Sequence, residues 1–157
     1  DKLFFENNPF EIVKSDKELN GLEKLKKVFK LQFQNQDQQE LNIMAAPLAK
    51  NPRILAEYIA NGQKILAPFF EELFQEGIKD GSIKNMKYPK AFSSLFTLII
   101  DFWFVPTIFP CSKEELIEKL YLIRDLCDTL GMPVIDDEIF ELAQYKIERV
   151  MEQVEKE

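Results

Sequence analysis

The sequence predicts an all-α protein, a bundle of six to seven helices in a single domain over residues 1–157. Three observations support this fold class. Apolar residues recur at intervals of three and four along most of the chain, the links between these runs are short and contain Pro, Gly, Ser or Asn, and almost no stretch alternates as a strand does. The apolar fraction of 46% is enough for a sizeable core.

Sequence signals mark three helix starts in the first third of the chain. Pro9 suits the first turn of a short helix. Ser15 followed by Glu18 is a capping-box pattern, which predicts a second helix that runs to about residue 36. Residues 41–48 predict a further short helix.

The longest predicted helix starts at Pro52 and ends in a double-glycine stop, Gly77 and Gly81. Pro68 lies inside this helix. Because proline lacks an N–H and its ring clashes with the carbonyl four residues back, we expect a kink between Lys64 and Pro68. The helix is expected to continue past the kink because its flanks are strongly apolar.

Proline and capping signals also define the C-terminal helices. Pro89 opens a segment that is apolar on nearly every side. Ser112 and Glu115 form a second capping-box pattern, and Asp136 is placed to cap a last helix over residues 137–155. A helix that is apolar all round must be covered all round. The segment after Pro89 therefore implies a second chain or a bound apolar molecule.

The charge of the chain argues against a nucleic-acid-binding surface. There are 27 acidic and 20 basic residues, which gives a formal net charge of −7. Lys24, Lys26, Lys27 and Lys30 form the densest basic group, but they are spread over helix turns between apolar residues, as on a solvated face. Because binding to a phosphate backbone needs clustered Lys and Arg, we expect this chain to bind DNA weakly if at all.

The lack of histidine narrows the possible chemistry. It removes imidazole acid–base catalysis, Ser-His and Cys-His nucleophile pairs and the usual zinc sites. No nucleophile elbow or Gly-rich phosphate loop is present in the sequence either. We therefore expect the protein not to be an enzyme, with no catalytic residues, no metal and no cofactor.

Other features predict a cytoplasmic protein with no membrane partner. Cys111 and Cys127 are not arranged as CxxC and are expected to be free thiols in a reducing compartment. The first residues lack the basic-then-apolar order of a signal peptide. Residues 91–109 approach transmembrane length, but Asp101 and Pro106 interrupt the run, and the helix is expected to end at Pro106.

Four segments follow one another in a distinctive order. The first segment is residues 21–25 (GLEKL), and the second is Glu71-Glu72-Leu73. The third, residues 76–83, has the pattern acid-Gly-apolar followed by acid-Gly-polar-apolar. After a short link, the fourth segment, Pro89-Lys90-Ala91-Phe92, begins the apolar helix. Their order, spacing and helix lengths together resemble the C-terminal regulatory domain of the TetR family of bacterial transcription repressors. The resemblance extends over most of the chain, from Pro9 to Gly131.

The resemblance implies a function in transcription regulation. Such a domain binds a small, largely apolar effector, forms a homodimer, and controls how an N-terminal helix-turn-helix binds operator DNA. Nothing in residues 1–13 resembles that DNA-binding module, so we expect it to be absent from this chain. The helix over residues 137–155 lies beyond the family's minimal core and is expected to be an addition that caps the dimer.

The resemblance also implies where the effector binds, between the long kinked helix and its neighbours. The candidate ligand-binding residues are mostly aromatic: Phe29, Phe33, Tyr58, Phe69, Phe70, Phe96, Asp101 and Trp103. For any one Phe, plain core packing is the alternative, so the pocket prediction depends on the group and on the resemblance.

Asp101 is the most specific single candidate for a ligand-binding residue, because it places a charge inside the apolar run LIIDFWF. A buried charge is costly unless it is paired. It is expected to anchor the ligand or to meet a base across the dimer, with Arg124 the best candidate; the alternative is that it lies on the one face that reaches solvent.

The family's dimer forms when the helices corresponding to residues 91–108 and 113–130 pair with their copies. The predicted interface residues are Phe92, Leu95, Ile99, Leu116, Leu120, Ile123, Cys127 and Leu130. The spacing of the last five also suits near-parallel helix packing. The alternative is that both helices pack only within one chain.

The sequence also allows a different function, a helical protein–protein interaction module without a small-molecule site. Such a module would have an apolar groove on its outside instead of an enclosed cavity.

Overall fold

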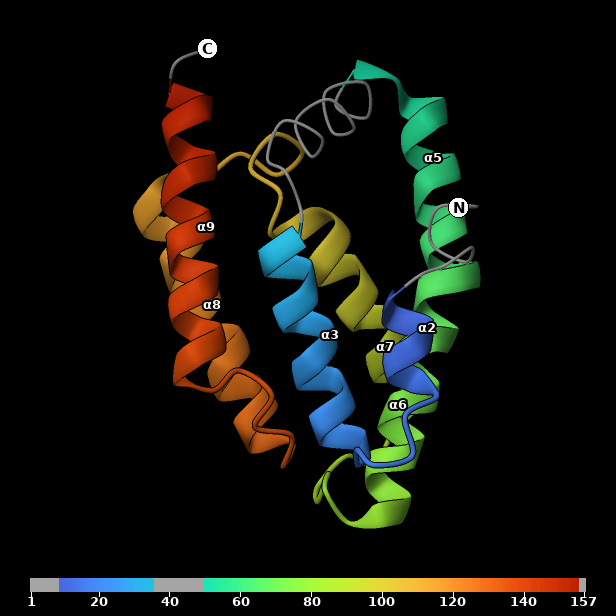
Figure 1. The fold of residues 1–157 in the computed structure, drawn as a ribbon. Coiled ribbons are helices and arrows are strands. Elements are labelled where there is room, and N and C mark those ends of the chain that lie inside the picture. The colour runs from blue at the N-terminus through green and yellow to red at the C-terminus, as the bar shows by residue number, and fades with distance from the viewer. Residues whose placement is uncertain (1–8, 36–49, 156–157) are drawn as a thin grey trace.

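The computed structural model describes residues 9–35 and 50–155, and within them the chain is helical with no strand (Figure 1). The all-α prediction is confirmed, while the helix expected over residues 41–48 lies outside the described residues. The elements are α2 (Pro9–Lys14), α3 (Gly21–Asn35), α5 (Pro52–Asn61), the π-helical η1 (Gly62–Leu66), α6 (Ala67–Asp80), α7 (Pro89–Leu98), the π-helical η2 (Ile99–Trp103), α8 (Lys113–Thr129) and α9 (Asp137–Glu155).

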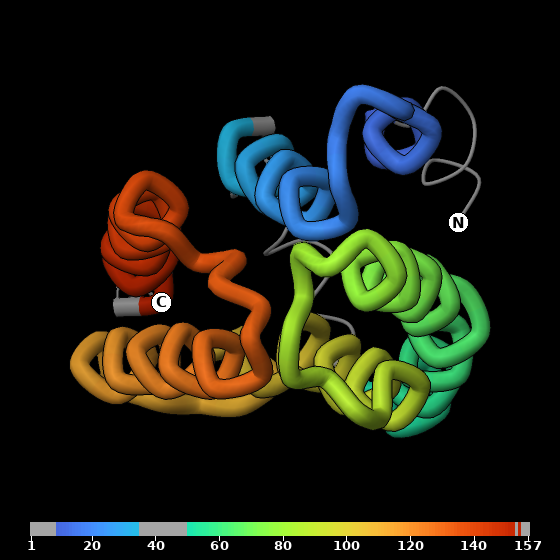
Figure 2. The backbone as a smooth tube through the Cα atoms, turned by 90° about the horizontal axis from the view of Figure 1, so that it is seen from below, coloured from blue at the N-terminus to red at the C-terminus, as the bar shows by residue number. Residues whose placement is uncertain are grey.

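The helices surround a common core. Seen from below, α2 and α3 lie along one side of the molecule and α7 and α8 along the opposite side, with α9 at one end and α5 and α6 at the other (Figure 2). Phenylalanine rings from α3, α6 and α7 fill the space between these helices. Phe96 sits at the centre, with its ring 5.7 Å from Phe29, 5.1 Å from Phe70 and 5.8 Å from Phe74, each in an edge-to-face arrangement.

Glycine lets α3 and α6 approach closely. A Cβ on Gly21 would lie 2.3 Å from the backbone nitrogen of Gly77, so no larger residue fits at the contact. Gly77 therefore lies inside α6 as a packing residue, and the expected double-glycine stop is wrong in this respect. The helix ends at Gly81, whose φ of 84° is the left-handed conformation that glycine adopts without strain.

The start of α3 differs from the predicted capping box. Asn20 takes that role: its side chain accepts from the Glu23 N–H at 2.8 Å, and the Glu23 carboxylate accepts from the Asn20 N–H at 3.0 Å. Ser15 instead follows the last residue of α2. The Asn20 pair satisfies two amide groups that the helix leaves open, which explains why the helix starts there.

Pro68 disturbs its helix in the predicted place. The segment immediately before it, η1, has π-helical bonding, and the Ala67 N–H donates to the carbonyl of Gly62, five residues back. Because Pro68 has no N–H to complete the α-helical ladder, the wider turn accommodates the missing bond. The helix continues on both sides, as α5 and α6.

The second π-helical segment, η2, has no proline inside it and was not predicted. The Phe104 N–H donates to the carbonyl of Ile99 at 3.1 Å, again five residues back. The helix opened by Pro89 therefore changes type after Leu98 and ends at Trp103, before Pro106. It does present a solvent-facing side, since Leu95 and Leu98 are exposed.

The C-terminal helices α8 and α9 begin at their predicted caps. Both bonds of the Ser112 capping box are present, and the Asp136 carboxylate accepts from the Ile139 N–H at 2.9 Å. The two helices pack against each other through a small cluster of buried apolar side chains: Leu116, Leu120, Phe140, Ala143, Ile147 and Met151.

This packing buries most of the predicted dimer-interface residues within one chain, while the dimer itself stays a prediction. Six of its eight side chains are buried within one chain, namely Phe92, Ile99, Leu116, Leu120, Ile123 and Cys127. Leu130 is partly buried against the same core. Leu95, exposed to 50%, is the member that remains available to another molecule. The heptad-like spacing of α8 is explained by α9, an intramolecular partner.

Candidate functional site

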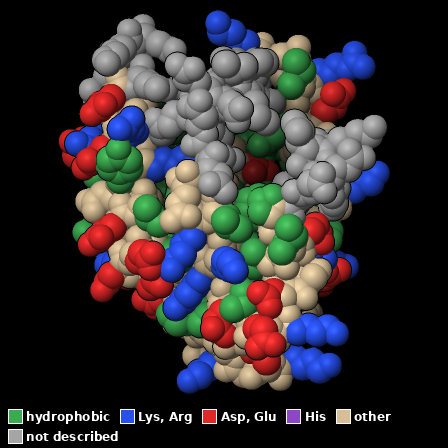
Figure 3. Space-filling view, in the orientation of Figure 1, with side chains coloured by type: hydrophobic (Ala, Val, Ile, Leu, Met, Phe, Trp, Pro, Cys, Tyr) green, Lys and Arg blue, Asp and Glu red, His purple; other side chains and the backbone are tan. Residues whose placement is uncertain are grey.

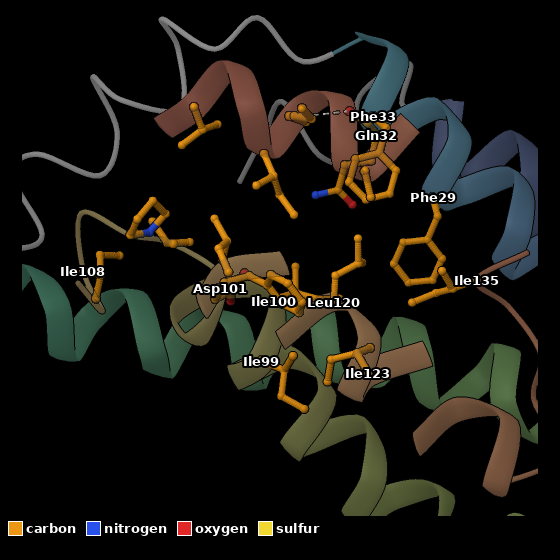
Figure 4. Close-up of a pocket in the computed structure, with 18 of the residues that line it drawn as sticks. Phe29, Gln32, Phe33, Ile99, Ile100, Asp101, Ile108, Leu120, Ile123 and Ile135 are labelled. Atoms are coloured by element: carbon orange, nitrogen blue, oxygen red, sulfur yellow. Dashed lines mark hydrogen bonds between the residues drawn. The ribbon is translucent and has the colours of Figure 1, made fainter. Parts of the chain in front are cut away.

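An apolar cavity of about 290 Å³ lies between α3, the η2 region and the C-terminal pair α8 and α9 (Figure 4). Its walls are mainly aliphatic and aromatic. The lining residues are Phe29, Gln32, Phe33, Tyr58, Phe96, Ile99, Ile100, Asp101, Phe104, Val105, Pro106, Thr107, Ile108, Leu116, Leu120, Ile123, Ile135, Ile139, Ala143, Lys146, Ile147 and Val150. An apolar cavity with a few polar groups in its wall is the usual form of a small-molecule site.

The cavity collects five of the eight predicted ligand-binding residues: Phe29, Phe33, Tyr58, Phe96 and Asp101. The other three, Phe69, Phe70 and Trp103, do not line it. Phe69 and Phe70 are buried in the main core. Trp103 instead lines a shallow hollow on the outside, with Phe109 and Leu122.

Sequence reasoning missed the contribution of α9, which was expected to cap a dimer. Ala143, Lys146, Ile147 and Val150 come from this helix and form one wall of the cavity. The spacing of Ala143, Ile147 and Val150 does predict an apolar face on α9, but the sequence gives no sign of what that face covers.

Asp101 is the acidic member of the lining. In Figure 4 it lies with Ile100 on one side of the cavity, across from Phe29 and Phe33 of α3. Within residues 9–35 and 50–155, no side chain or backbone amide forms a hydrogen bond or ion pair with its carboxylate. Burial raises the pKa of Asp101 to about 6.

The carboxylate of Asp101 fits because its neighbour on η1 is glycine. A Cβ on Gly62 would lie 2.7 Å from Oδ2 of Asp101, so even alanine would press on the carboxylate. Next to this contact, the Gln63 amide donates to the Ser94 carbonyl at 3.1 Å and accepts from the Ser94 hydroxyl at 2.7 Å. These contacts hold the π-helical η1 against α7.

Two further polar groups line the cavity, the Tyr58 phenol and the Thr107 hydroxyl. Burial, with the nearby Asp101 charge as a smaller cause, raises the pKa of the Tyr58 phenol to about 12, so the phenol keeps its proton at neutral pH. The Tyr58 ring meets Phe102 edge-to-face at 5.5 Å. The Thr107 hydroxyl is buried and has no hydrogen-bond partner within the described part of the chain.

Lys146 is the basic member of the lining and comes from α9. Its ammonium donates to the backbone carbonyl of Gln32 at 3.4 Å and lies 5.6 Å from the centre of the Phe33 ring. Burial lowers its pKa to about 8. The cavity thus carries one acidic and one basic side chain in a wall that is otherwise uncharged and mainly apolar.

Arg124 does not meet Asp101 within the chain. Its guanidinium stacks on two aromatic rings on the α9 side of α8, 4.3 Å from the centre of Phe140 and 5.3 Å from that of Tyr121. The predicted pairing across a dimer stays a prediction.

Three of the four lysines of α3 belong to ion pairs. Lys24 pairs with Glu76 at 2.6 Å, Lys26 with Asp136 at 3.7 Å and Lys30 with Glu138 at 2.7 Å. On the face shown in Figure 3, basic and acidic side chains are interspersed. This arrangement suits a solvated surface better than a phosphate-binding one.

Within the described residues, no group of His, Cys, Asp and Glu side chains is arranged to hold a metal ion. No helix among them combines the length and the apolar character needed to cross a membrane. Comparison of the chain with protein-family profiles, with curated proteins and with solved structures finds no match.

Proposed function

We propose that this chain is a ligand-responsive regulatory domain whose cavity binds a small, largely apolar effector. The cavity itself carries the proposal: helices far apart in sequence, α3 and α9 among them, converge on about 290 Å³ of apolar space. A core selected only for stability leaves few voids larger than a water molecule. A space of this size, with Asp101, Thr107 and Lys146 in its wall, suits a bound molecule better than a packing fault.

The proposed domain acts as a homodimer through the outer side of α7 and α8. These two helices lie along the same side of the molecule (Figure 2). Leu95 and Leu98 of α7 are exposed to 50% and 38%, Leu122 of α8 to 56%, and Phe109, in the link before α8, to 51%. Exposed apolar surface of this kind favours association. A two-fold contact would bury the same residues on both copies.

Regulation then requires that the effector binds one arrangement of the helices better than another. The resemblance to TetR-family domains suggests the output: the change reaches a basic helix-turn-helix outside these residues and alters its fit to operator DNA. The long helix α5–η1–α6 is suited to transmit it, because Tyr58 of α5 lines the cavity.

A cavity-filling substitution tests the effector site. Ala143→Leu extends a buried side chain into the cavity, and Ala91→Leu makes the same change on the exposed surface of α7. With 4-phenylbutanol as the probe in calorimetric titration, we expect the cavity variant to lose roughly tenfold or more in affinity. The surface variant should bind as the wild type does. Equal binding by both variants, or none by the wild type, would reject the site.

The dimer has a separate test. Sedimentation of the wild type at micromolar concentration should show a dimer, and Leu98→Glu with Leu122→Glu should convert it to single chains. A wild type that sediments only as single chains would remove the dimer from the proposal.

A second candidate function is a protein–protein interaction module. The hollow lined by Trp103, Phe109 and Leu122 supports it, because this outer surface could bind a partner protein even if no small molecule occupies the cavity.

A further inference from the structure

We propose that the ligand of this cavity is an amine: an apolar body that carries one positively charged nitrogen, held at Asp101. This inference rests on the proposed function of the cavity and names the chemical class of its occupant. Three features of the structure support it: a carboxylate to which no described group donates, the aromatic side chains of the cavity wall, and the existing bonds of the basic residue Lys146.

The carboxylate of Asp101 has the position of a ligand anchor. It lies in the wall of an apolar cavity, and within the described residues nothing donates to it. Taking a carboxylate out of water without a partner is costly, and a cation in the cavity would offset that cost. By contrast, the buried ammonium of Lys24 is paired with the Glu76 carboxylate at 2.6 Å.

A structural role for the Asp101 charge finds little support. The carboxylate caps no helix, since no backbone N–H of the described chain bonds to it. Its side chain also depends on the lack of a Cβ at Gly62, which gives it room without giving it a partner. An apolar residue of similar size would leave η2 bonded as it is, because the π-helical bond runs between backbone groups of Ile99 and Phe104.

Aromatic rings in the cavity wall suit a cationic nitrogen. Tyr58 lines the same cavity and lies close enough for the Asp101 charge to act on its phenol. Phe96 also lines the cavity. The faces of such rings attract an ammonium group, most strongly where water is excluded.

Lys146 favours an amine over an acid as the occupant. An acidic ligand would need this ammonium, which already donates to the Gln32 carbonyl and lies over the Phe33 ring. The same acid would add a second negative charge to a cavity that holds Asp101. A cation would share the cavity with the Lys146 ammonium, but at Asp101 it would meet a carboxylate to which no described group donates.

Three probes with one apolar body separate the alternatives: 4-phenylbutylamine, 4-phenylbutanol and 4-phenylbutyrate, titrated calorimetrically at pH 7.5. A charge-assisted bond to a desolvated carboxylate should make the amine bind roughly tenfold or more tightly than the alcohol. Asp101→Asn should abolish this preference, so that the amine and the alcohol bind the variant with affinities within about twofold of each other. Asp125→Asn, which removes an exposed acid from α8, should keep the preference.

Gly62→Ala is a second variant for the case in which Asp101→Asn fails to fold. It retains the charge but presses on Oδ2 from 2.7 Å, so it should weaken the amine more than the alcohol. Equal affinity for amine and alcohol, tightest binding of the acid, or a preference that survives Asp101→Asn would overturn the amine inference and leave the cavity proposal standing. If none of the three probes binds the wild type, both proposals fail.

Discussion

Replacing Asp101 by Asn is expected to stabilise the empty protein at neutral pH. Burial raises the pKa of this carboxyl from 3.8 to about 6. At about 1.4 kcal/mol for each tenfold change in proton affinity, ionised Asp101 costs the fold about 3 kcal/mol. Asparagine has a similar shape and no charge, so the variant should recover most of this free energy, less the cost of leaving its amide without partners.

The sign of the pH dependence follows from the raised pKa. Below pH 3.8 the Asp101 carboxyl is protonated in both the folded and the unfolded chain. Its ionisation therefore makes no contribution to the difference in unfolding free energy between Asp101→Asn and the wild type. Between 3.8 and about 6 the unfolded chain loses its proton first, and the wild type is progressively destabilised. Above about 6 both forms are ionised, and the stabilising effect of the substitution reaches its full value.

Urea unfolding at fixed protein concentration, followed by circular dichroism between pH 4 and pH 8, measures this difference. The other acids titrate alike in both proteins, so the difference between the two curves isolates Asp101. Asp125→Asn on the exposed side of α8 is the matched control and should change the unfolding free energy little at any pH. A difference between Asp101→Asn and wild type that does not grow with pH would show that Asp101 is well solvated.

Three further expectations concern packing, reactivity and capping. Gly21→Ala should lower the free energy of unfolding by about 2 kcal/mol or more, measured in urea, because its Cβ would lie 2.3 Å from the Gly77 backbone nitrogen; an unchanged value would mean that α3 can shift away from α6. In the native protein only Cys111 should react with a disulfide reagent, whereas in guanidinium both thiols should react. The reason is that Cys127 is fully buried, and burial raises the pKa of its thiol to about 12. Two fast-reacting thiols in the native state would contradict this. Ser112→Ala should cost about 1 kcal/mol by thermal or urea unfolding, with Ser→Gly at the same position costing less; equal losses would argue against the cap.

The Asp101 substitution links stability to the proposed binding. The same change is expected to stabilise the empty protein and to remove the preference for an amine, which is the relation expected when a binding group is kept at a cost to the fold. A residue kept for structure alone would show the opposite sign, with loss of stability on substitution. The two measurements together therefore distinguish a ligand anchor from a structural acid.

Several elements could be predicted from the sequence because their causes are local. The capping box at Ser112, the Asp136 cap and the left-handed stop at Gly81 each involve residues within one turn of the helix end. The same holds for the irregular turn before Pro68, which follows from the missing N–H of that residue. Five of the predicted ligand-binding residues also line the cavity, four of them aromatic and the fifth Asp101; the resemblance to TetR-family domains, not helical spacing alone, suggested this group.

Only the tertiary structure decided what each apolar face covers. The Leu116–Cys127 face of α8 has the spacing of a dimer seam, yet α9 and the core cover it within the same chain. Helical spacing says that a face must be buried but not which partner buries it, because a helix from the same chain and one from a second copy satisfy it equally. The role of Lys146 in the cavity and the position of Asp101 against Gly62 likewise arise from contacts between segments far apart in sequence, which no local pattern records.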